Sequence, residues 1–505
     1  MFRRIQDLPL LVILMGIAAL TMYLPAVQAF ATRQHMVARA FFYSGTILMI
    51  LTVMIAIATV NRRTRNPARA NLTALVASYI VLPVLFALPF SESVRDTSFL
   101  NAWFEMLSAF TTTGATLYDD PTRLPETVHL WRALVGWLGG FFILVAAMAI
   151  LAPMNLGGVE VISGRVPGRG EGLSQITRIA DPAQRVVRHA IVLFPAYGSL
   201  TLTLWVLLLM SGDTSLVALC HAMGAISTSG ISPVGGLQGS ASGILGEVLV
   251  FLVLLTALSR RTMPGTTLMD RNTKLWKDSE IRMALVILAT VPCILVLRHW
   301  IGATEAGEEQ NFAAAMAAFW GALFTTLSFL TTTGYASADW ATARVWSGLG
   351  TPGLVLAGLA IVGGGVATTA GGVKLLRVYA LFRHGERELE RLIHPSSIGG
   401  AGQSARRLRR EGAYVAWIFF MLFAMSIAVI CAALSLVRIE FEAALVLTIA
   451  ALTTTGQLAV LAAEQPILYA DLGGAAKAIL GFAMVIGRLE TLAILALLAP
   501  DSWRR

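Results

Sequence analysis

The sequence predicts an all-α polytopic membrane protein, with two N-terminal spans followed by four fused units of span, short helix and span. Three observations predict this fold class: the composition, ten long apolar runs, and one motif that occurs four times. Of the 505 residues, 56% are hydrophobic and 13% are charged, and the mean hydropathy is +0.72. A soluble domain carries roughly 25% charged residues. The composition therefore excludes an ordinary cytosolic enzyme and a disordered chain.

The ten apolar runs are the expected membrane spans, because a spanning helix needs about 20 mostly apolar residues. They are too long and too little alternating to be strands of a membrane barrel. The seventh run is the shortest and is expected to extend at both ends. The runs cover residues 8–30, 41–60, 74–90, 131–151, 190–210, 243–258, 284–297, 346–375, 413–437 and 475–498.

Four shorter apolar segments lie between the later runs, at residues 98–110, 215–226, 311–330 and 442–452. Segments of about 10–14 residues are too short to span and suit re-entrant or buried helices. The third contains Gly321, and we expect it not to be helical over its whole length. Together with their flanking spans, the segments divide the chain into an N-terminal helix pair and four repeats, the third with a broken second span: 1–70, 71–160, 161–265, 266–400 and 401–505.

Basic residues gather in alternate loops, at residues 1–7, 61–73, 152–189, 259–283, 374–412 and 499–505. These loops hold 28 of the 38 Lys and Arg residues but only 12 of the 29 acidic residues. Basic loops stay in the cytoplasm, so both termini are expected there. The net charge of +9 then reflects topology, and no nucleic-acid partner is expected. Arg3, Arg4 and the first run also resemble a cleaved secretory signal, but the run is longer than such signals usually have, which favours a retained helix.

Each short segment ends in three hydroxyl-bearing residues followed by a glycine. The four glycines are spaced by 116, 104 and 122 residues. One such turn is common, whereas four at equivalent places indicate a repeat. The plain alternative, a glycine that only caps each buried helix in the left-handed conformation, leaves the recurrence unexplained. The tetrads comprise Thr111, Thr112, Thr113 and Gly114; Ser227, Thr228, Ser229 and Gly230; Thr331, Thr332, Thr333 and Gly334; and Thr453, Thr454, Thr455 and Gly456.

The tetrads have the chemistry of an ion filter. Non-helical backbone at membrane depth is tolerated only where it is buried in protein or lines a water-filled cavity. Four strands of carbonyls aimed at one axis replace an ion's hydration shell, and glycine permits the angles that turn a carbonyl inward. The hydroxyls can hold the neighbouring backbone, and the negative C-terminal ends of four helices favour cations. The predicted fold is thus four fused span–pore-helix–span units around one central pore.

The eighth run contains a glycine-rich interruption that ends shortly before Lys374. A phosphate-binding P-loop is excluded, because the spacing GxxxxGK[ST] is not met. A glycine kink within a packed helix is one alternative. Five glycines in ten residues, each costing about 1 kcal/mol in a helix, favour an unwound intramembrane loop. The residues of interest in this broken segment are Gly363, Gly364, Gly365, Thr368, Thr369, Gly371 and Gly372.

Arg488 lies in the last apolar run. A guanidinium at the centre of a span costs roughly 2.5–3.5 kcal/mol on insertion scales, so it is expected to face a cavity or a partner. A structural ion pair with Glu490 is the alternative, although residues two positions apart point to different helix faces. His221, in the second short segment, is expected to be a packing residue, the alternative being a proton carrier.

With these motifs, the chain resembles the Trk/Ktr/HKT superfamily of potassium transporters, and within it the bacterial TrkH/TrkG-type subunit. The likeness covers nearly the whole chain, including the two N-terminal spans. The first and third tetrads fit the filters of this family well, and the second fits more loosely. After Gly456 stands Gln457, where that branch typically has proline, so the last filter strand departs from the family pattern.

The resemblance implies potassium uptake across a bacterial inner membrane, with all four filter glycines favouring potassium over sodium. It implies that the broken segment gates the pore below the filter and that Arg488 projects into the pore as a barrier. It also implies a homodimer and a cytoplasmic TrkA-like nucleotide-binding ring, docked on basic loops such as 383–411, which alternatively bind anionic membrane lipid.

The chain is expected to bind no cofactor and to catalyse no covalent chemistry, with the potassium ion as its substrate. Two other transport functions stay open from the sequence. One is the potassium-binding subunit of an ATP-driven pump. The other is a cation symporter with substantial sodium transport.

Overall fold

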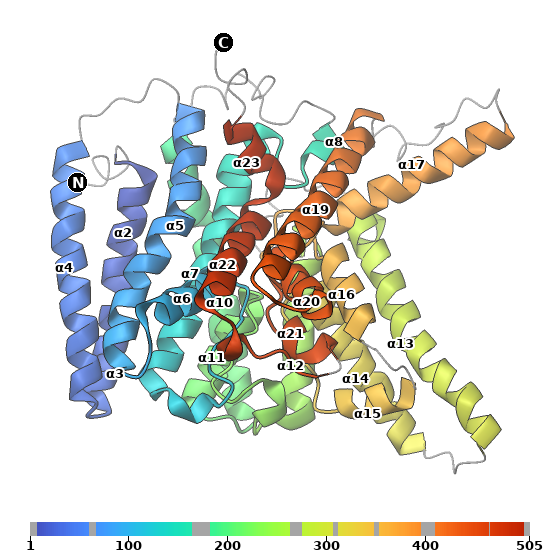
Figure 1. The fold of residues 1–505 in the computed structure, drawn as a ribbon, viewed down its shortest axis with the longest axis horizontal. Helices are drawn as coiled ribbons and strands as arrows, with labels where there is room; N and C mark the ends of the chain where they lie inside the picture. Colours follow the sequence, from blue (N-terminus) through green and yellow to red (C-terminus); the bar gives the residue numbers. More distant parts are fainter. Residues whose placement is uncertain are drawn as a thin grey trace.

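The computed structural model describes residues 8–59, 67–163, 182–262, 275–306, 312–347, 353–394, 410–463 and 465–498. Over these ranges the chain forms helices and no strand, as Figure 1 shows. Eight of the described helices are long and apolar enough to cross a membrane. The prediction of an all-α polytopic membrane protein is therefore confirmed.

Two N-terminal spans lie at one edge of the molecule (Figure 1). Helix α2 (Leu10–Thr21) continues through Met22 into α3 (Tyr23–Ala31), and the two form one apolar span. Helix α4 (His35–Thr59) returns alongside them, and both α2 and α4 pack on α5 (Pro67–Ser93). Residues 1–7, which carry the first two arginines, lie outside the described residues.

The remaining helices follow one order four times: a long helix, a shorter helix ending at a tetrad, and a returning helix. The first group is α5, α6 (Phe99–Phe110) and α7 (Glu126–Ala146), and the second is α10 (Pro182–Met210), α11 (Ser215–Ile226) and α12 (Gly243–Leu254). The third is α13 (Ser279–Ala306), α14 (Phe312–Leu330), α15 (Trp340–Ser347), α16 (Gly353–Val362) and α17 (Leu375–Ile393). The fourth is α19 (Arg410–Leu436), α20 (Phe441–Leu452), α21 (Leu458–Ala462), α22 (Gly474–Leu489) and α23 (Thr491–Leu498).

The structure corrects the expectation for the segment that contains Gly321. Helix α14 is continuous over its 19 residues, where we expected an interruption. A Cβ built on Gly321 would come within 2.6 Å of the Asp339 carbonyl oxygen. The glycine is there because the following loop crosses the helix closely, and its helical cost of about 1 kcal/mol is offset by this packing.

Two of the expected spans are divided within the described residues. In the run at 346–375, α16 ends at Val362, and a non-helical stretch follows until α17 begins at Leu375. The run at 475–498 is divided into α22 and α23 by Glu490, which has a φ of 63°. Hydropathy reports the apolar character of a run but not its backbone angles, so the second division could not be predicted.

The shorter helices α6, α11 and α20 lie inside the molecule, and their C-terminal halves are buried. The outer helices instead expose large apolar side chains. Examples are Ile57 on α4, Met210 on α10 and Leu436 on α19, which are 74%, 79% and 86% exposed. Apolar exposure on this scale matches a surface covered by lipid rather than by water.

Candidate functional site

Each tetrad leaves its helix through the same backbone turn. In the first, second and fourth tetrads the first residue keeps helical angles. In all four tetrads the second residue takes a left-handed φ, between 53° and 57°. The third residue then donates its N–H to a carbonyl of the preceding helix at 2.8–2.9 Å, as Thr113 does to Ser108. The turn ends the helix and starts a short non-helical segment, which we call the strand of that repeat although it forms no sheet.

The left-handed residue that caps each of these helices is a threonine, not the glycine that we considered. Thr112, Thr228, Thr332 and Thr454 all take this conformation, which is unfavourable for a β-branched residue. Such strain persists where the surroundings impose it, and it is concentrated at functional sites. The same strained conformation at the equivalent position of all four repeats indicates that the tetrads form a functional site.

Hydroxyl groups tie each strand to its helix. The Thr111 hydroxyl donates to the Leu107 carbonyl at 2.8 Å and is hydrogen bonded to the Thr113 hydroxyl at 2.8 Å. Ser227, Thr331 and Thr453 make the same pair of contacts, at 2.7–2.9 Å to the helix carbonyl and 2.9–3.3 Å to the second hydroxyl. This is the role that the hydroxyl-rich sequence predicts.

The glycines of the first two tetrads are packed against the next repeat. A Cβ built on Gly114 would overlap the Ser229 carbonyl oxygen, and one built on Gly230 would overlap the Thr333 carbonyl oxygen. Only glycine leaves room for a neighbouring backbone at this distance. Repeat 1 therefore contacts repeat 2, and repeat 2 contacts repeat 3, through equivalent atoms.

The other two glycines close the ring with different contacts. A Cβ built on Gly334 would lie 3.0 Å from Cβ of Gln457 in repeat 4, and one built on Gly456 would overlap the Ala115 nitrogen of repeat 1. The four strands thus follow one another around a common axis. We call this arrangement of Gly114, Gly230, Gly334 and Gly456 the glycine ring.

The fourth strand differs from the others at its glycine. Gly114, Gly230 and Gly334 have φ values of 71°, 61° and 84°, whereas Gly456 is not among the residues with positive φ. Its N–H donates to the Thr113 carbonyl oxygen of repeat 1 at 2.6 Å. The fourth tetrad departs from the family sequence pattern at Gln457. At Gly456, beside it, the backbone geometry also differs from that of the other three tetrads.

Buried polar groups that the sequence analysis missed hold the strands from behind. Glu105 forms an ion pair with Arg132 at 2.6 Å and accepts the Leu117 N–H at 3.0 Å, just after the first tetrad. Glu247 accepts the Ser337 hydroxyl and the Ala338 N–H, both at 2.7 Å, just after the third. Their only sequence signal is a carboxylate within an apolar run.

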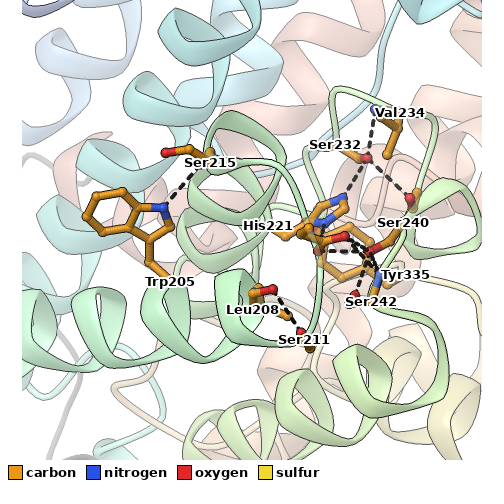
Figure 2. Close-up of polar contacts among 12 residues, drawn as sticks. Trp205, Leu208, Ser211, Ser215, His221, Ser232, Val234, Ser240, Ser242 and Tyr335 are labelled. Atoms are coloured by element: carbon orange, nitrogen blue, oxygen red, sulfur yellow. Dashed lines mark hydrogen bonds and ion pairs between the residues drawn. The ribbon is translucent and has the colours of Figure 1, made fainter.

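A similar network supports the second strand, as Figure 2 shows. His221 Nε2 is hydrogen bonded to the Ser232 hydroxyl at 2.8 Å, and its ring meets the Tyr335 ring edge to face at 5.9 Å. The Tyr335 hydroxyl donates to the Ile231 carbonyl at 2.9 Å, which links the third strand to the second. His221 is fully buried, as expected of a packing residue.

Asp213 lies behind His221, in the loop between α10 and α11, with Oδ2 3.9 Å from His221 Nδ1. Burial raises the pKa of Asp213, but the His221 side chain and the Ser240 hydroxyl outweigh this effect and lower the pKa to about 2. The carboxylate therefore stays ionised at neutral pH and keeps accepting from Ser240 and Ser242.

The broken segment at 363–374 lies against the helix-side ends of the tetrads. The Gly371 N–H donates to Thr332 Oγ1 at 2.7 Å, and the Thr369 hydroxyl donates to the Ile226 carbonyl at 3.3 Å. A Cβ built on Gly371 would overlap Thr453 O and Thr454 Oγ1. The prediction of an unwound loop rather than a kinked helix is therefore confirmed.

The loop is also held to its surroundings by its backbone. The Gly365 N–H donates to the Ala257 carbonyl at 3.0 Å, and the Val366 N–H donates to Glu280 Oε1 at 2.8 Å. Lys374 is buried and donates to the Ala370 carbonyl. Partners for the loop's polar groups are what allow irregular backbone at membrane depth.

Arg488 faces this loop, and Glu490 is not its partner. Nη1 of Arg488 donates to the Thr369 carbonyl oxygen at 2.7 Å. Nε and Nη2 have no partner with hydrogen-bond geometry among the described residues. A cavity of about 20 Å³, room for about one water molecule, lies here, and Arg488, Lys374 and Gly371 are among its lining residues.

Glu490 instead pairs with Arg377, a residue that the sequence analysis did not single out. The Arg377 guanidinium is fully buried and forms ion pairs of 2.6 Å with both Glu490 and Glu160. It lies 3.7 Å from the centre of the Phe419 ring. This cluster joins α17, directly after the broken segment, to α8 (Glu160–Ser163), α19 and the α22–α23 break.

The fold and the site define a class of protein. A polytopic helical protein with strands around one axis and an intramembrane loop beneath them is built as a membrane transport protein, not as an enzyme. The TrkH family model, described as a cation transport protein, matches residues 37–235 and 243–504. This chain therefore belongs to the TrkH family.

Individual relatives agree with the family. The chain is 29% identical over 489 residues to the Trk system potassium uptake protein TrkH of Salmonella typhimurium, covering 96% of each chain, and equally similar to that of Escherichia coli K12. It is similar in structure to the crystal structure of the potassium transporter TrkH from Vibrio parahaemolyticus, with a TM-score of 0.78, 26% identity and complete coverage of both chains.

Proposed function

We propose that this protein takes up potassium across the bacterial inner membrane through a filter formed by the four tetrads. The curated relatives are named as potassium uptake proteins and cover nearly the full chain, which supports potassium as the substrate. The filter residues are those of the glycine ring together with the two hydroxyl residues before each glycine. The ion itself is the substrate, and no bound cofactor is part of the mechanism.

The observation that carries this proposal is the packing of the glycine ring. Because the Gly114 and Gly230 positions each adjoin a carbonyl oxygen of the next repeat, backbone oxygens of different repeats come together at one axis. A ring of carbonyls that replaces the hydration shell is the physical basis of cation selectivity. The helix ends behind the ring add partial negative charge.

Unpartnered hydroxyls support an ion path through the ring. The Thr112 and Thr454 hydroxyls are buried and have no hydrogen-bond partner among the described residues. Buried polar atoms are rarely left unsatisfied without a reason such as an ion site. These hydroxyls are suitable ligands for a dehydrated cation at the inner end of the filter.

The broken segment and Arg488 would close the pore below the filter. The loop contacts Thr332 of repeat 3 and adjoins Thr454 of repeat 4, directly under the strands. Arg488 adds a fixed positive charge beside it. A cation leaving the filter inward would meet this charge and a cavity that holds about one water molecule, so the loop must move for conduction.

The regulatory part of the proposal rests on the family. A homodimer and a cytoplasmic TrkA-like ring fit a chain whose relatives are named as members of a Trk system. The cytoplasmic basic segment at 383–411 would carry this contact or bind lipid. Residues 395–409 of it lie outside the described residues.

The test is ion flux in proteoliposomes under an imposed voltage, with potassium and sodium compared for the wild type and Gly114→Ser. We expect the wild type to prefer potassium. We expect the variant to lose most of that preference, because its side chain would overlap the Ser229 carbonyl oxygen and its φ of 71° is strained for serine.

Gly473→Ser is the matched control, because a Cβ there meets nothing within 4 Å and serine is a good helix cap at that position. Absence of potassium flux in the wild type would contradict the proposed function. Unchanged selectivity in Gly114→Ser would contradict the assignment of the glycine ring as the filter. Uptake that needs ATP hydrolysis by a co-purifying pump would favour the pump-subunit alternative.

A further inference from the structure

In repeat 4 the backbone carbonyl of the ring glycine is committed to partners in its own repeat. Gly456 O accepts hydrogen bonds from the Tyr469 hydroxyl at 3.0 Å and from the Ala459 N–H at 3.2 Å. A carbonyl oxygen has two lone pairs, and these two donors use both. Repeat 4 therefore lacks a free carbonyl at the level of the glycine ring.

The Gln457 side chain reaches across the ring instead. Its Cβ lies 3.0 Å from a Cβ built on Gly334. Its Cγ lies 4.0 Å from a Cβ built on Gly230. Its Nε2 donates to the Gly114 carbonyl oxygen at 3.3 Å. One side chain thus approaches the ring glycine of each of the other three repeats.

We propose that the carboxamide of Gln457 is a filter ligand, which supplies to the cation the oxygen that Gly456 does not. A carboxamide oxygen has the same ligand chemistry as a peptide carbonyl. In the structure the NH₂ end of the amide faces Gly114. A half-turn about the last side-chain torsion, which is broad and soft, presents Oε1 to the ring. This inference rests on the proposed function, because it requires a cation in the ring.

The amide then has two positions with opposite effects. With NH₂ toward Gly114, its partial positive charge competes with a cation for that carbonyl oxygen. With Oε1 inward, it completes the cation's coordination. Because selectivity depends on the number and field strength of the ligands, the residue at this position sets both the apparent affinity and the preference between potassium and sodium.

Two substitutions at this position distinguish a ligand role of the Gln457 carboxamide from a packing role of its side chain. Gln457→Met keeps the unbranched Cβ and Cγ that lie beside Gly334 and Gly230 but removes the oxygen. Gln457→Glu keeps the shape, removes the N–H donor and adds a charged oxygen of higher field strength. We expect the Met variant to raise the potassium concentration for half-maximal flux about tenfold. We expect the Glu variant to lower it, and to shift selectivity toward sodium by about threefold or more.

Gln238→Met is the matched control. Gln238 also donates Nε2 to a backbone carbonyl of another repeat, that of Ser337 at 3.1 Å, but it does not contact the glycine ring. We expect flux and selectivity of this variant to stay within twofold of the wild type, because Glu247 still holds the Ser337 hydroxyl and the Ala338 N–H. A second readout is thermal unfolding in detergent, where potassium should stabilise the wild type more than Gln457→Met, since a ligand that binds the folded state raises its stability.

The outcomes separate this inference from the proposed function. If the wild type carries potassium, and both Gln457 variants stay within twofold of it in affinity, selectivity and stabilisation by potassium, Gln457 is not a ligand. The inference is also overturned if Met and Glu impair affinity to the same extent, because that indicates packing alone. If the wild type carries no potassium, the proposed function fails first, and this inference fails with it.

Discussion

Arg488 Nη1 donates to the carbonyl oxygen of Thr369 at 2.7 Å, across 119 residues of sequence. The contact joins the last span to the broken segment of the third repeat. Arg488 is the residue expected to act as a barrier, and the loop is expected to act as a gate. The two are therefore linked directly by this hydrogen bond. A movement of the loop away from the filter breaks this hydrogen bond and frees the guanidinium.

Replacement of Arg488 by Ala is expected to increase cation leak. It removes a positive charge below the filter and a charge-assisted hydrogen bond, which contributes about 1.5–3 kcal/mol to the closed position of the loop. We expect basal flux of the chain alone, measured in proteoliposomes, to increase tenfold or more. Arg488→Lys keeps the charge, so a smaller increase should follow. Equal flux in wild type and Arg488→Ala would place the barrier elsewhere.

Gly371→Ala is expected to open the pore. A Cβ there would overlap Thr453 O and Thr454 Oγ1. The loop therefore cannot keep its position directly below the strands. We expect higher basal flux, because a displaced loop no longer blocks the path below the filter. Gly358→Ala, on α16 just before the loop, is the control, because its Cβ meets nothing within 4 Å. A Gly371→Ala variant that folds with wild-type flux would show that the loop does not gate the pore.

Arg377→Met is expected to destabilise the protein strongly. It leaves the Glu160 and Glu490 carboxylates buried without their cation, and breaking a buried ion pair in this way costs about 3–5 kcal/mol. The midpoint of thermal unfolding in detergent should fall clearly. Arg123→Met removes an ion pair with Asp96 whose partners are 53% and 63% exposed, so little change is expected. Comparable shifts in both variants would argue against a structural role for the Arg377 cluster.

Tyr335→Phe is expected to lower selectivity without preventing folding. It removes the hydroxyl that donates to the Ile231 carbonyl and so links the third strand to the second. The hydrogen bond contributes about 0.5–1.5 kcal/mol net, so the loss in the potassium-to-sodium flux ratio should not exceed about tenfold. Tyr118→Phe serves as the control, because its hydroxyl donates to Thr97, which lies before α6 and outside the tetrads. A ratio that stays unchanged in Tyr335→Phe would mean that this link does not shape the filter.

Much of the architecture can be predicted from the sequence because its signals are local. Hydropathy indicates where spans lie, the recurring tetrads indicate where helices stop, and clustered glycines indicate that the segment near Gly364 is not helical. Arg488 is conspicuous for the same reason, since a charged group deep in an apolar run needs a partner. These features follow from the free-energy cost of placing polar groups in hydrocarbon. That cost acts on each segment separately, so its effect is visible in the local sequence.

The partners of these residues were decided only by the tertiary structure. That Glu490 pairs with Arg377 and not with Arg488 depends on helices that meet across more than 100 residues of sequence. The same holds for Gln457, which reaches the Gly114 carbonyl of a repeat 343 positions away. Sequence determined which residues must be satisfied inside the membrane. The packing of four repeats around one axis determined what satisfies them, because contacts between distant segments leave no periodic signal in either segment alone.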